Sequence, residues 1–116
     1  MNGQDLMNEI KNYGDLLNKA VPEFKQRGID KALTEKNYRI ALATEFLKLR
    51  SEGEKVTIMS DLARGKEEVA DLKFKRDVAE TLYESAKEAI YIYKKQMDTL
   101  MTIYKIEWGH TKNAWN

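Results

Sequence analysis

The sequence contains no cysteine, and one proline and six glycines occur among its 116 residues. Without cysteine the chain forms no disulfide framework and no thiolate metal site, which is typical of a protein of the reducing cytoplasm. So few breakers of regular structure argue against a loop-rich or all-β fold. The composition therefore favours a helical protein.

An excess of charge of one sign is also missing, because 20 Lys and Arg residues stand against 19 Asp and Glu residues. Neither half of the chain is a polycation, so no basic arm for nucleic acid or anionic lipid is indicated. No window approaches ~18 consecutive apolar residues, and no basic segment with an apolar run follows Met1. We therefore expect a cytoplasmic protein that neither spans a membrane nor is exported by a signal peptide.

The sequence does contain a long heptad repeat between residues 61 and 108. Apolar residues recur there at steps of three and four, which are the a and d positions of a coiled-coil-like helix. The a series is Leu62, Val69, Arg76, Tyr83, Ile90, Met97 and Tyr104, and the d series is Leu72, Ala79, Ala86, Tyr93 and Leu100. This pattern predicts one long helix of about 45 residues over 61–108.

The ends of this long helix are less strongly marked than its middle. Ser60 is the predicted N-cap, and Gly109 is predicted to end the helix before a frayed tail at 109–116. Gly65 indicates a kink or a second start as an alternative, because Glu67 and Glu68 suit a new first turn. A helical glycine costs only about 1 kcal/mol, which favours a continuous helix.

Two shorter helices are predicted before the long one, over residues 4–21 and 30–51. The second has an apolar arc wider than one seam requires, which predicts packing on more than one side. Pro22 and Gly28 predict a hinge between these helices. Residues 52–60 form the predicted connection, in which Val56, Ile58 and Met59 close the end of the bundle. A short β-strand in this segment is the alternative.

These elements predict an all-α single domain over 1–116, a helical hairpin or three-helix bundle built on the long helix. Antiparallel neighbours would have residue numbers that sum to about 113, which places Arg76 near Asn37 and Tyr38. Its side chain would either snorkel to solvent or meet Glu35 or Asn37 and fix the helix register. Two arrangements remain open for the C-terminal half of the long helix, around residues 89–108, which we call its distal half. Either the first helix continues the line of the second past Pro22 and covers it, or another chain covers it.

No pattern for catalysis, a cofactor or a metal occurs in the sequence. His110 is the one histidine and has no ligand partner at metal-binding spacing, and no Gly-rich phosphate loop precedes a helix. Glu80, Glu84 and Glu88 form an i, i+4 ladder that is typical of a solvated helix face. We therefore expect no enzyme, no cofactor and no metal site.

The distal half of the long helix instead carries an excess of apolar surface. Ile92, Ile103 and Ile106 form a second stripe beside the seam, which exceeds what one neighbouring helix covers. The predicted protein interface comprises Ile90, Ile92, Tyr93, Met97, Leu100, Met101, Ile103 and Tyr104. We predict a homo-oligomer, most simply a dimer that pairs the long helices around residues 89–108, and a further protein partner.

Nucleic-acid binding is the alternative function. Lys87, Lys94 and Lys95 flank Tyr91 on the long helix, which would place cations on a phosphate backbone and an aromatic ring against a base. Acidic residues on the same surface weaken this interpretation. Residues 56–72 also have the look of a helix-turn-helix, although the second helix would open on Glu67 and Glu68.

The segments YRIALA (38–43), LRSEG (49–53), VT (56–57), DLARG (61–65) and KRDVAE (75–80), with Tyr83, resemble small all-helical proteins of phages and prophages of Gram-positive bacteria. The likeness covers about residues 35–108. It implies a phage protein in the host cytoplasm, among early genes of DNA metabolism or host takeover, but no functional residues. We therefore expect an interaction module that modulates a host or phage DNA-processing or defence protein, or alternatively a nucleic-acid-binding accessory protein of phage DNA metabolism.

Overall fold

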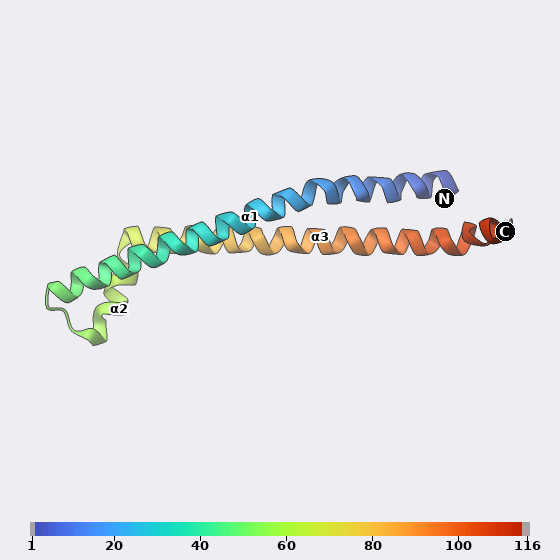
Figure 1. Cartoon of the computed structure of the whole chain (residues 1–116). Helices are drawn as coiled ribbons and strands as arrows, with labels where there is room; N and C mark the ends of the chain where they lie inside the picture. The colour runs from blue at the N-terminus through green and yellow to red at the C-terminus, as the bar shows by residue number, and fades with distance from the viewer. Residues whose placement is uncertain (1, 115–116) are drawn as a thin grey trace. The chain divides into compact units, whose positions relative to one another are not determined.

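The computed structural model describes the backbone of residues 2–114 and the side chains of residues 2–109. It contains the helices α1 (Gly3–Ser51), α2 (Val56–Gly65) and α3 (Glu67–Ala114), and the described residues include no strand (Figure 1). The predicted all-α fold is confirmed. Contacts divide the chain into two compact units, of which unit 1 joins residues 1–25 to 85–116 and unit 2 consists of residues 26–84.

α1 is one helix where two helices and a hinge were predicted, so the boundaries 4–21 and 30–51 are wrong. Pro22 lies inside it, and the side chains of Pro22 and of Asn18, four residues earlier, are both exposed. The Asn18 carbonyl, which loses its N–H partner at Pro22, is therefore on a side of the helix that water reaches. Gly28 closes no turn. A methyl group on Gly28 would lie 3.5 Å from the Tyr83 ring, an ordinary contact distance, so the approach of α1 to α3 does not require a glycine here.

The long helix predicted over 61–108 is divided into α2 and α3, so its predicted continuity is wrong. Lys66 has extended backbone angles, φ −66° and ψ 131°, between the two helices. Its ammonium group donates a hydrogen bond of 2.9 Å to the Glu45 carboxylate of α1. Glu67 and Glu68 then occupy the first turn of α3, where carboxylates stabilise the helix dipole.

The packing of α2 explains this break. Met59 and Ala63 are buried against Leu49 of α1, and these contacts require the chain to leave the line of α3 at Lys66. The predicted closing role is thus confirmed for Met59, whereas Val56 and Ile58 are exposed. Ser60 is not an N-cap, because it lies inside α2 and its hydroxyl accepts a hydrogen bond of 2.6 Å from Arg64.

The remaining ends also differ from the prediction. The connection between α1 and α2 is shorter than the predicted segment 52–60, and Gly53, with φ +79°, follows the last turn of α1. α3 continues through Gly109 to Ala114, so the predicted end at Trp108 and the frayed tail from residue 109 are wrong. Gly109 tolerates a helical backbone at a cost of about 1 kcal/mol. Residues 115–116 lie outside the described part of the chain.

The predicted heptad seam of α3 is the side that faces α1. Every a and d residue from Val69 to Tyr104 is buried or half-buried, although Leu62, now in α2, is exposed. In unit 2 the Arg76 guanidinium carbon lies 4.6 Å from the centre of the Tyr38 ring, as the antiparallel register predicts. In unit 1 residues 3–25 of α1 cover the distal seam, which is the first of the two arrangements that the sequence left open.

Candidate protein-interaction surface

The eight predicted interface residues form two groups within unit 1. One group is half-buried and consists of Ile90, Tyr93, Met97, Leu100 and Tyr104. The other group is exposed and consists of Ile92, Met101 and Ile103. The first group belongs to the seam between α3 and α1, so only the second group offers a free apolar surface.

Aromatic rings pack closely in the seam of unit 1. The ring of Tyr13 in α1 is tilted against that of Tyr93 in α3, with centroids 6.3 Å apart, and within α3 Tyr104 stacks on Trp108 at 5.8 Å. A methyl group on Gly3 would lie only 3.2 Å from the Trp108 indole, so the absence of a side chain at Gly3 leaves room for this ring. Sequence reasoning missed the pairing of Gly3 with Trp108, because the small residue and the large one are about a hundred positions apart.

The outer stripe of unit 1, which we define as Ile92, Ile103 and Ile106, flanks this seam. Its members occupy the c and g positions of the α3 heptad and are between 41 and 70% exposed. They extend over about 21 Å of helix, with Gln96 and Thr99 between them. Such a surface offers no chemistry, but it can bury apolar area against another molecule.

The four residues of the predicted nucleic-acid surface are all exposed. Lys95 places its ammonium nitrogen 5.5 Å from the centre of the Tyr91 ring, one turn earlier in α3. Lys87 and Lys94 share this side of the helix with the exposed carboxylates of Glu84, Glu88 and Asp98. The positive charge is therefore largely balanced on this surface.

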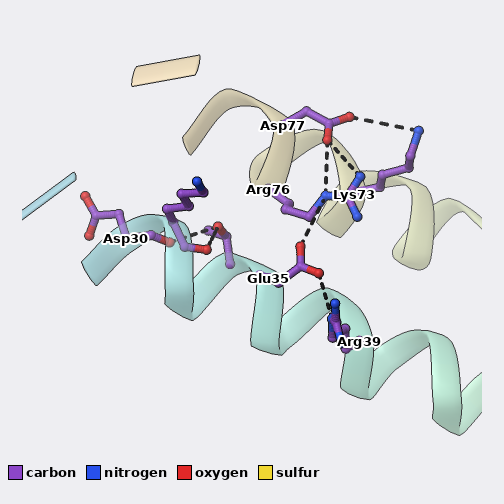
Figure 2. Close-up of polar contacts among 8 residues, drawn as sticks. Asp30, Glu35, Arg39, Lys73, Arg76 and Asp77 are labelled. Atoms are coloured by element: carbon purple, nitrogen blue, oxygen red, sulfur yellow. Dashed lines mark hydrogen bonds and ion pairs between the residues drawn. The ribbon is translucent and has the colours of Figure 1, made fainter. Parts of the chain in front are cut away.

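Arg76 is the charged residue in the seam of unit 2, and Figure 2 shows its polar contacts. Its Nη2 donates to Asp77 at 2.9 Å, and its Nε lies 3.5 Å from the Glu35 carboxylate, as predicted. The other Glu35 oxygen accepts a 2.7 Å hydrogen bond from Arg39. The hydrogen bond to Asp77, with the charges of Asp77 and Glu35, raises the pKa of Arg76, although desolvation opposes the shift. Arg76 is thus a permanent cation that fixes the register of two helices.

No three His, Cys, Asp or Glu side chains in the described residues are arranged to hold a metal ion. None of the described helices is long and apolar enough to cross a membrane. The His110 side chain lies outside the described residues.

Comparison with known proteins adds no family to this description. The chain matches no protein-family model, no curated protein and no solved structure. The resemblance to phage proteins stays a prediction. The functional proposal therefore rests on the surfaces of the two units.

Proposed function

We propose that the protein is a phage-encoded interaction module of the host cytoplasm that self-associates and modulates a DNA-processing or defence protein of the host or phage. The exposed outer stripe of unit 1 is the observation that carries the interaction itself, whereas the phage origin and the class of partner rest on the sequence resemblance alone. Fully burying an exposed isoleucine side chain is worth about 1.5 to 3 kcal/mol, and these three, which are 41 to 70% exposed, would each contribute a corresponding part of that. An exposed apolar stripe of this kind therefore favours a bound partner over a free surface.

The form of the stripe supports a helical segment as the partner's contact element. Ile92, Ile103 and Ile106 lie along one side of α3 in steps that follow the helix period. An amphipathic helix of another protein presents apolar residues with the same period, so it can lie along this side. We assign this surface to the partner protein.

The test uses a charge introduced into the stripe and a matched charge beside it. Ile103→Glu places a carboxylate in the stripe, whereas Thr102→Glu places one on the neighbouring exposed position. A partner recovered from infected-cell lysate by the parent and by Thr102→Glu, and lost with Ile103→Glu, supports the proposal. Equal recovery with both variants, or no specific partner, contradicts it.

Nucleic-acid binding is the second candidate, and the contact of Lys95 with Tyr91 favours it. This function predicts salt-sensitive binding of single- or double-stranded DNA, because Lys residues displace counterions from phosphates. Lys94→Glu combined with Lys95→Glu should then abolish the mobility shift. If the parent protein gives no shift at low salt, this candidate is dismissed.

A further inference from the structure

The α1 helix has a second apolar side in unit 2 that no part of unit 2 covers. Its members, which we call the α1 stripe, are Ile29, Leu33, Ile40 and Leu47, and they are between 52 and 67% exposed. Two residues along a helix are separated by about 200°. Ile40 and Leu47 therefore point away from the buried Tyr38 and Leu49, which each lie two positions away.

The α1 stripe has the period of a coiled-coil seam. Leu33, Ile40 and Leu47 follow one another at intervals of seven and form an a series, and the matching d series is Ile29, Lys36, Ala43 and Arg50. All seven side chains are exposed. Such a seam fits another helix, because only a helix presents side chains at the same seven-residue spacing.

We propose that the helix that fills this seam is α1 of a second copy of the chain, antiparallel to the first. This inference rests on the proposed self-association and places its surface on α1 instead of on residues 89–108 of α3. A parallel, in-register pair would place Lys36 and Arg50 against their own copies, which like-charge repulsion disfavours. The antiparallel pair avoids both contacts.

In the antiparallel pair the apolar residues of the α1 stripe in one copy also lie beside those of the other copy. In an antiparallel coiled coil the a residues of one helix lie beside the d residues of the other. Ile29 then lies beside the partner's Leu47 and Leu33 beside the partner's Ala43, while the stem of Lys36 covers the partner's Ile40. Arg39 approaches its own copy near the two-fold axis, but its 2.7 Å ion pair with Glu35 offsets that charge.

The exposed area agrees with what a dimer needs. The four large side chains of the α1 stripe expose roughly 400 Å² in each copy, and interfaces are about 60% apolar by area. The corresponding contact is roughly 700 Å² per copy, which approaches the ~800 Å² per partner of a standard interface. A second copy therefore accounts for the stripe without a further component.

Thiol crosslinking tests the proposed register, because the full chain has no cysteine of its own. Ile29→Cys and Leu47→Cys are made separately and treated with a short bis-maleimide, alone and as a mixture. We expect crosslinked dimers to be several-fold more abundant in the mixture than with either variant alone. Dimers from each single variant alone would indicate a parallel pair and overturn the proposal.

Light scattering at tens of micromolar separates this inference from the proposed self-association. We expect a dimeric parent, a dimeric Ile103→Glu variant and a monomeric Ile40→Glu variant with unchanged helix content. A dimer that Ile40→Glu leaves intact and Ile103→Glu dissociates would overturn the α1 surface while self-association stands. A monomeric parent would overturn both.

Discussion

Arg76 occupies an a position of the α3 seam, where an apolar residue is usual. It is accommodated because the Tyr38 ring lies under its guanidinium, because Asp77 accepts its hydrogen bonds, and because the Glu35 carboxylate forms an ion pair with it at 3.5 Å. Its side chain is 23% exposed, whereas that of Arg39, which pairs with the same Glu35, is 77% exposed. The two arginines therefore share a carboxylate but differ in packing.

Arg76→Ala should lower the free energy of unfolding by about 1 to 2 kcal/mol, because it removes a cation–π contact, ion pairs and a packed stem. Arg39→Ala should lower it by at most about 0.5 kcal/mol, since exposed ion pairs contribute little. Urea denaturation of both variants measures the difference. Equal effects would show that Arg76 contributes no more than a surface charge.

Alanine substitutions at Gly28 and Gly53 should change the stability in opposite directions, because the backbone conformations at the two positions differ. Gly28→Ala should stabilise the protein by about 0.5 to 1 kcal/mol, since the helix gains a better former and the new methyl group meets the Tyr83 ring at an ordinary contact distance. Gly53→Ala should destabilise it by about 1 kcal/mol, because φ at this position is +79°. Urea midpoints that move in the same direction for both variants would contradict this account.

At the scale of elements, the break between α2 and α3 depends on contacts with α1. Ala63 is fully buried and Met59 nearly so, while Lys66 at the break reaches Glu45 with a 2.9 Å ion pair. Glu67 and Glu68 stabilise the new start of α3, because their carboxylates lie in its first turn, near the positive end of the helix dipole. Tertiary contacts thus decide where the helix ends.

The Lys66 ion pair predicts a dependence of stability on alkaline pH. The hydrogen bond to Glu45 raises the pKa of Lys66 above its usual value, with desolvation as an opposing effect. A raised pKa in the folded state contributes stability that is complete below the unfolded pKa of about 10.4 and is lost as pH rises through the folded value. The urea midpoint should therefore fall above about pH 10.4, and it should fall less in Lys66→Arg, whose guanidinium does not titrate there. Identical pH profiles for parent and variant would remove Lys66 from the explanation.

At the scale of the whole molecule, self-association would couple stability to protein concentration. A dimer that dissociates on unfolding gains stability by mass action as the concentration rises. For a chain of 116 residues we expect the Tm to rise by about 6 °C between about 1 and about 100 µM. Ile40→Glu should abolish this rise. A Tm independent of concentration in the parent would indicate a protein that unfolds as a monomer.

The sequence by itself determined the helical class, the α3 seam from Val69 to Tyr104 and the antiparallel register that brings Arg76 to Tyr38. Heptad periodicity is a local property, and one apolar side of a helix must be buried, so both can be deduced from spacing alone. The excess of apolar residues on α3 was visible in the same way. The second stripe beside the seam was visible too, but the sequence did not show that five of the eight predicted interface residues are half-buried, because that depends on which residues α1 covers.

Only the tertiary structure decided which of the two helix-breaking residues, Pro22 or Gly65, lies at an interruption of a helix. Pro22, the stronger breaker, lies on an exposed side of α1 and leaves the helix continuous, whereas the chain breaks beside Gly65, where the penalty for a continuous helix is only about 1 kcal/mol. The difference arises because α2 gains contacts with Leu49 by leaving the line of α3. A local penalty of a few kcal/mol is overridden by packing between residues distant in sequence, and such packing cannot be deduced from the spacing of residues along one helix.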